Sequence, residues 1–278
     1  ARRLLWATSM PDVLRVTILG CASSGGVPRI GAKGPNWGAC DPSNPRNRRR
    51  RCALLVQRIG DGGKTTVLLD AGPEVREQLI DAGAGGLNAL VLTHDHADHV
   101  HGIDDLRMVV FTRRERLPCW MDERTWATMQ QRFGYVFETP PGSSYPPIMD
   151  HHAITGPVTV DGRGGAITCE PFQVPHGDIM ALGFKIGPLV YTPDLSEMSD
   201  DAWSAVDGVD CWSTDALRYT PHPSHANVAT ALEWINRAKP RRAILTNLHV
   251  DIDYETLAVQ TQDHVEPAHD GLIIDYPI

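Results

Sequence analysis

The chain has 278 residues, 42% of them hydrophobic, which is enough to bury the core of one large domain or of two small ones. Its 26 Lys and Arg residues against 34 Asp and Glu give a formal net charge of -8, which excludes a positive field over the whole molecule of the kind that gathers nucleic acid. No apolar run is long enough to span a bilayer, and the six cysteines form no Cys-x-x-Cys pair, so we expect a soluble, cytoplasmic protein without a disulfide framework.

Residues 1–12 are expected to form an N-terminal extension, because Met10 precedes the first strand-like run, and residues 13–278 to form a single domain. The predicted elements of its first half run in chain order as follows: strand Val13–Leu19 ending in the Gly20–Gly26 loop, strands Cys52–Gln57 and Thr65–Leu69 joined as a hairpin, helix Pro73–Ala82, strand Ala89–Thr93, helical segments Asp104–Glu115 and Asp122–Phe133, and surface loop Thr139–Pro147.

The second half repeats this mixture of strands and helices. Its predicted elements are strands Ala166–Val174, Leu182–Ile186, Leu189–Thr192 and Val209–Trp212, a helix from His225 to Ala238, strand Ala243–Thr246, a short helix at Tyr254–Gln262 and strand Leu272–Ile274. Two clusters of strands, each accompanied by helices, predict an α/β fold in which two sheets pack face to face with helices outside, an αββα sandwich.

The segment His94-Asp95-His96-Ala97-Asp98-His99 follows directly on a predicted strand. In a loop that leaves a strand, His94 and His96 would point to one side, and Asp98 and His99 to a second point nearby, an arrangement that suits two metal ions. Imidazole and carboxylate ligands favour zinc, manganese or iron over an ion such as calcium, which takes only oxygen ligands. Three later residues at predicted strand ends would complete the site, namely His176, Asp194 and His249.

The H-x-H-x-D-H segment, followed by spaced His, Asp and His, resembles the metallo-β-lactamase superfamily over roughly Val13 to Ile274. The Gly25-Gly26-Val27-Pro28 loop and the Pro221-His222-Pro223-Ser224-His225 segment are similar to the branch of PhnP-like phosphodiesterases and tRNA 3′-end endonucleases. The resemblance implies two divalent metal ions per chain, Zn or Mn. It assigns His94, His96 and His176 to one ion, Asp98, His99 and His249 to the other, and makes Asp194 the bridge. Because only Cys40 remains of the cysteine cluster that often binds a structural zinc in this branch, no third metal is expected.

The same resemblance implies hydrolysis of a phosphodiester, with His225 and Asp98 as catalytic residues. His225 would act as the general acid and would bind substrate together with His222. We expect Ser224 to cap a helix, so that His225 lies in the first turn and the positive helix end lowers its pKa. Asp70 and Asp95 are expected to orient the ligand histidines through hydrogen bonds.

The expected substrate is a small cyclic or nucleotide-like phosphodiester, with no membrane partner, and a homodimer is left open. A tRNA 3′-processing endonuclease is an alternative, although we find no basic, glycine-rich arm to grip a large nucleic acid. A thioesterase, a lactonase or a catalytically silent metal- or nucleotide-binding regulator also stays open, because a fold does not fix a function. The run Arg46–Arg51 is interpreted as arginines paired with the chain's excess acids rather than as a phosphate-binding surface.

Overall fold

The computed structural model describes residues 12–278 and consists mainly of two seven-stranded sheets. The predicted N-terminal extension therefore lies outside the described residues except for Asp12. In spatial order the first sheet contains β16 (Leu272–Pro277), β1 (Val13–Gly20), β4 (Ala53–Gly60), β5 (Gly63–Leu69), β6 (Ala89–Val91), β7 (Leu117–Met121) and β8 (Met149–Ala153). The second contains β15 (Val265–Pro267), β14 (Arg242–Thr246), β13 (Cys211–Asp215), β12 (Leu189–Thr192), β11 (Ile179–Ile186), β10 (Ile167–His176) and β9 (Val158–Val160).

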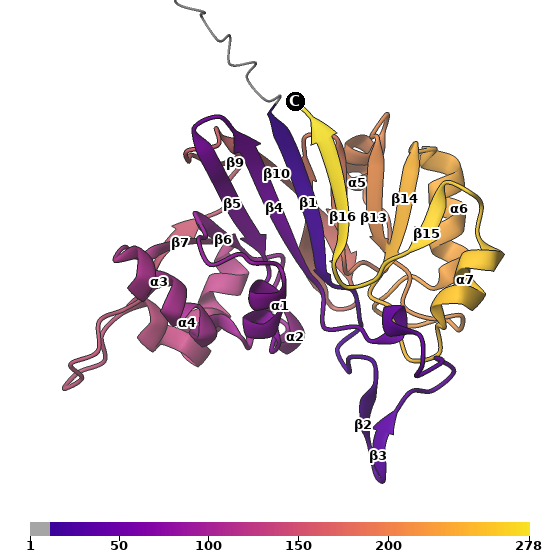
Figure 1. Ribbon diagram of the computed structural model, residues 1–278, viewed down its shortest axis with the longest axis horizontal. Coiled ribbons are helices and arrows are strands. Elements are labelled where there is room, and N and C mark those ends of the chain that lie inside the picture. Colours follow the sequence, from indigo (N-terminus) through magenta and orange to yellow (C-terminus); the bar gives the residue numbers. More distant parts are fainter. Residues whose placement is uncertain (1–11) are drawn as a thin grey trace, which may run out of the picture.

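Helices cover the outer faces of the two sheets (Figure 1). Those beside the first sheet are α1 (Val75–Asp81), α2 (Ala97–Val100), α3 (Arg107–Arg113) and α4 (Glu123–Phe137). Those beside the second sheet are α5 (Asp200–Val206), α6 (Val228–Ala238) and α7 (Tyr254–Gln260). Two 3₁₀ turns, Pro45–Asn47 and Ile103–Leu106, complete the helical elements. The predicted αββα sandwich is confirmed.

Three apolar layers hold the sandwich together. Along β4, Leu54 and Val56 belong to the layer between the sheets, whereas Ala53 and Leu55 pack with helices α1, α3 and α4. A strand buried on both faces must be apolar throughout, which is why these segments read as continuous hydrophobic runs. Trp212 anchors the third layer, between the second sheet and helices α5–α7.

The structure contains short elements that the sequence did not predict. They are β2 (Arg29–Gly31), β3 (Gly34–Asn36), β7, β8, β9, β15, α2 and α5. In β8, only Met149 is fully buried, and its polar residues give no strand signal by themselves. This strand exists because it pairs in parallel with β7. Helix α1 begins at Val75, two residues after the predicted start at Pro73.

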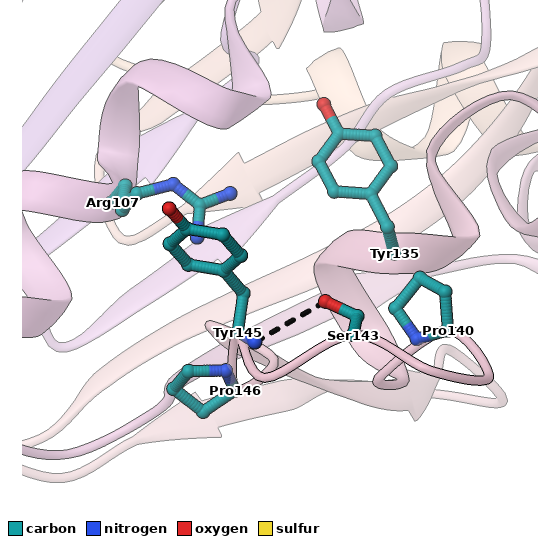
Figure 2. A pocket seen from close by; sticks show the side chains of 6 residues that line it. All are labelled: Arg107, Tyr135, Pro140, Ser143, Tyr145 and Pro146. Carbon is teal, nitrogen blue, oxygen red and sulfur yellow. Dashed lines mark hydrogen bonds between the residues drawn. The ribbon is translucent and has the colours of Figure 1, made fainter.

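The loop from Thr139 to Pro147 follows α4, as predicted, and carries no helix or strand. Tyr145 and Pro146 from this loop, with Tyr135 of α4 and Arg107 of α3, line a cavity of about 290 Å³ (Figure 2). The backbone N–H of Tyr145 donates to Ser143 Oγ at 3.2 Å. This hydrogen bond lies within the loop, and the Tyr145 side chain is largely exposed.

Part of the arginine run is paired with acids, as interpreted from the sequence. Arg50 contacts Asp81 at 2.7 Å and Asp270 at 2.9 Å, and Arg51 contacts Glu74 at 2.6 Å. Arg49 is buried and donates to the carbonyl of Ile252 at 2.5 Å.

All six cysteines are buried free thiols. Within residues 12–278, no helix has the length and apolar character needed to cross a membrane.

Candidate active site

The polar residues of the site gather where strands of both sheets end. His94 lies three residues beyond β6, His176 ends β10, Asp194 lies two residues beyond β12, and Asp215 ends β13. A backbone hydrogen bond from Leu182 N–H to the Thr93 carbonyl, 2.9 Å long, joins the two sheets beside the site. Ligands commonly bind at the carboxyl ends of parallel strands, and this edge brings together residues 121 positions apart.

Four predicted ligands form one compact group. One ligand atom from each of His94, His96, His176 and Asp194 lies within 4.8 Å of the others. Burial lowers the pKa of His94, His96 and His176, so these imidazoles are neutral, the form that binds metal. His94 Nε2 is buried and has no hydrogen-bond partner within the described residues. An unpaired imidazole nitrogen facing a carboxylate fits a divalent cation.

Asp194 lies between this group and a second one. Its Oδ2 is 3.5 Å from His176 Nε2 and 3.8 Å from His94 Nε2, whereas its Oδ1 is 3.3 Å from His99 Nε2. The two oxygens therefore face different histidines. Asp194 could therefore contact an ion held by either group.

The second group is a buried histidine surrounded by acids. His99 Nδ1 lies 2.7 Å from Asp70 Oδ2, and His99 Nε2 lies 3.7 Å from Asp98 Oδ2. Burial lowers the pKa of His99, but Asp194, Asp70 and Asp98 outweigh it and raise the pKa well above its usual range. Three carboxylates lie around one buried imidazole, and buried negative charges are stable only beside positive charge. A divalent cation would supply that positive charge in place of the proton. The prediction that Asp70 orients a ligand histidine agrees with this contact.

The structure does not bring His249 into either group, contrary to the prediction. Its Nδ1 lies 2.9 Å from Asp251 Oδ2, and its pKa is lowered by burial and by Arg29. The reason is a turn in the backbone. Asn247, with a φ of 60°, is the residue after β14 that turns inward, and its Nδ2 donates to Asp215 Oδ1 at 3.2 Å.

Asp95 also differs from its prediction. Its Oδ1 accepts a hydrogen bond from Arg124 Nη1 at 2.8 Å, and its backbone carbonyl accepts one from Arg132 Nη1, also at 2.8 Å. The side chain thus faces α4 rather than the ligand histidines. Asp95 fixes the ligand loop to the neighbouring helix.

His225 lies beside the first group but not in a helix. Helix α6 begins at Val228 and is capped by Asn227, so the predicted cap at Ser224 is wrong, and so is the predicted lowering of the His225 pKa. The His225 ring is 4.6 Å from the His176 ring and 5.1 Å from the His222 ring.

The pKa of His225 depends instead on Asp215, a residue that the sequence analysis did not single out. His225 Nδ1 lies 2.7 Å from Asp215 Oδ2. Burial lowers the pKa of His225, but the charge and hydrogen bond of Asp215 outweigh it and raise the pKa to about 9. Burial in turn raises the pKa of Asp215 to about 7. A signal for Asp215 was present, since it comes at the end of a strand, as Asp70 does.

Comparison with known proteins shows the family of this chain. The model of the beta-lactamase superfamily domain matches residues 65–247, which contain His94 to His99, His176 and Asp194. The chain belongs to the metallo-β-lactamase superfamily. A solved structure described as a new diphosphatase from the PhnP family is 30% identical, with a TM-score of 0.83 over 97% of this chain and 98% of that one. This likeness places the metallo-β-lactamase domain in the PhnP-like branch, as predicted.

Two further proteins resemble this chain, one in sequence and one in fold. A Porphyromonas gingivalis protein named octanoyltransferase is 30% identical over 269 residues, 94% of this chain. The chain spans only 52% of that relative's length. Zinc-bound PqqB from Methylobacterium extorquens is 19% identical, with a TM-score of 0.71 over 94% of this chain and 100% of that one, and shares the fold. The predicted class, a metallo-β-lactamase superfamily hydrolase, is confirmed for this domain, whereas the comparisons leave its substrate and metals open.

Proposed function

We propose that the chain is a binuclear metal-dependent phosphodiesterase that cleaves a small cyclic or nucleotide-like phosphodiester. The observation that carries this proposal is the His225–Asp215 pair beside the ligand group, with 2.7 Å between His225 Nδ1 and Asp215 Oδ2. Hydrolysis of an alkyl phosphodiester expels an alkoxide, which needs a proton at the moment of cleavage. A protonated histidine next to the ligand residues supplies one.

Two divalent ions, zinc or manganese, would be held by the residues that fit them. His94, His96 and His176 would hold one ion, Asp98 and His99 the other, and Asp194 would contact both. When bound, the ions supply Lewis-acid activation of water and charge stabilisation of the phosphoryl oxygens. Asp70, through its hydrogen bond to His99 Nδ1, fixes the orientation of that ring.

The protein's own side chains would donate the proton and contact the substrate. Asp215 holds the proton on His225 Nδ1, which leaves Nε2 to donate to the departing oxygen. His222 lies beside His225, with 5.1 Å between the ring centroids, and would contact the substrate. Arg218 acts electrostatically on His222, the residue proposed to contact the substrate. This positive charge beside the site suits an anionic substrate.

The test uses two substrates that differ in leaving group. The protein is stripped of metal by chelation, and manganese or zinc is returned stepwise during assays of bis-p-nitrophenyl phosphate and of a cyclic nucleotide. We expect metal-dependent cleavage of both. Because p-nitrophenolate leaves without a proton, His225→Ala should slow the cyclic nucleotide roughly 10² to 10⁴-fold and bis-p-nitrophenyl phosphate much less. No cleavage of either with any metal would overturn the proposal and favour a thioester or lactone substrate.

A nuclease is the second candidate because of one structural feature. The hairpin β2–β3 projects from the body of the molecule (Figure 1), and its connecting segment contains Lys33. The sequence analysis did not predict this projection. If the hairpin grips RNA, RNA binding should weaken steeply with rising salt, because each phosphate contact releases counterions. Deleting the hairpin should then abolish RNA cleavage but not cleavage of small substrates.

A further inference from the structure

A cavity of about 480 Å³ opens beside the ligand group and is not accounted for by the chemistry above. It is lined by His96, Ala97, His101, Arg132 and Phe133. His96 is exposed and belongs to the compact ligand group, so the cavity adjoins that group directly. A substrate whose phosphoryl group reaches the ligands can extend into this cavity past His96.

The aromatic wall of the cavity is placed there by a break in α4. Phe133 has φ −131° and ψ 26°, outside the helical region, and kinks the helix. In a regular helix, neighbouring residues are turned about 100° apart, yet Arg132 and Phe133 line the same cavity. The Phe133 ring meets the His101 ring edge to face, with 5.6 Å between centroids. The ring also packs against the apolar layer shared with α1, α3 and α4, so its position is set from two sides.

The guanidinium of Arg132 is fixed as well, and its charge is not cancelled. Arg132 Nη1 donates to the Asp95 carbonyl at 2.8 Å, which ties it to the loop that carries His94 and His96. The Asp95 carboxylate itself is taken by Arg124. Among residues 12–278, the ion pairs include none of Arg132 with a carboxylate within 4.0 Å.

We propose that this cavity is a nucleobase subsite, so that the substrate of the proposed phosphodiesterase is a nucleotide rather than a simple sugar phosphate. An aromatic ring and a planar guanidinium are the two surfaces on which a nucleobase stacks. The inference rests on the proposed function for its reaction, but the subsite itself is a binding property. It can therefore be tested without turnover.

The test is calorimetric titration of the manganese-loaded protein with adenosine 5′-monophosphate and with ribose 5-phosphate, which lacks the base. We expect the nucleotide to bind roughly 10-fold or more tightly than the sugar phosphate, as stacking on one aromatic side chain provides. Phe133→Ala and Arg132→Ala should each remove most of this preference by weakening nucleotide binding. Ribose 5-phosphate should keep its affinity to within about 3-fold.

Tyr135→Ala is the matched control. Tyr135 belongs to the same helix but lines the separate cavity shown in Figure 2, so its loss should leave the preference for the nucleotide intact. Equal affinity of the native protein for both ligands would overturn the subsite. So would Phe133→Ala and Arg132→Ala proteins that remain folded by circular dichroism and keep the full preference. Because binding is measured apart from cleavage, an inactive protein that still prefers the nucleotide would refute the phosphodiesterase and retain the subsite.

Discussion

Replacing Asp215 with Asn should move the alkaline limit of activity to lower pH. The pKa of His225 rises from 6.5 to about 9 although burial opposes the rise. That increase corresponds to about 3 kcal/mol of extra stabilisation of the imidazolium, at about 1.4 kcal/mol per pH unit. A general acid works only while protonated, so activity is lost as the pH rises through its pKa. Asn keeps the size of the side chain but removes the charge, so the His225 pKa falls.

The assay is the pH profile of kcat/KM for a cyclic nucleotide with manganese returned. We expect the alkaline limb of the Asp215→Asn enzyme to lie roughly 2 pH units below that of the native enzyme. Divalent cations bound nearby would lower the His225 pKa in both enzymes. The difference between the two alkaline limbs therefore remains. Asp210→Asn is the matched control, because Asp210 flanks the other end of β13 and pairs with the exposed Arg241. An unshifted alkaline limb in Asp215→Asn would refute the assignment of His225 as the acid.

Two further predictions concern metal affinity and stability. Asp70→Asn should weaken metal binding about 10- to 100-fold, because His99 Nδ1 loses its charged partner; metal titration of the stripped protein measures this, and unchanged affinity would contradict it. Asn227→Ala should lower the free energy of unfolding by about 1 kcal/mol, because Asn227 Oδ1 accepts the Thr230 N–H at 2.9 Å and caps α6. Denaturant unfolding tests the second prediction, with Asn227→Ser as the variant that should recover the loss.

Local patterns predicted much of the fold and part of the site. The hairpin of β4 and β5 was predictable because Gly60 and Gly63 pair across its turn, which is a short-range signal. The segment from His94 to His99 could be read because its ligand types lie within six residues after a strand. Short strands such as β8 could not, because their partners rather than their own residues determine them.

The sequence by itself determined which residues could hold metal, since ligand chemistry belongs to side-chain type and close spacing. Only the tertiary structure decided which distant residues meet. The parallel register of β13 and β14 sets Asp215 opposite Thr246, and the left-handed turn at Asn247 directs that residue inward and leaves His249 outside. A backbone angle at one residue and a register between two strands are fixed by packing, and packing is a property of the whole chain.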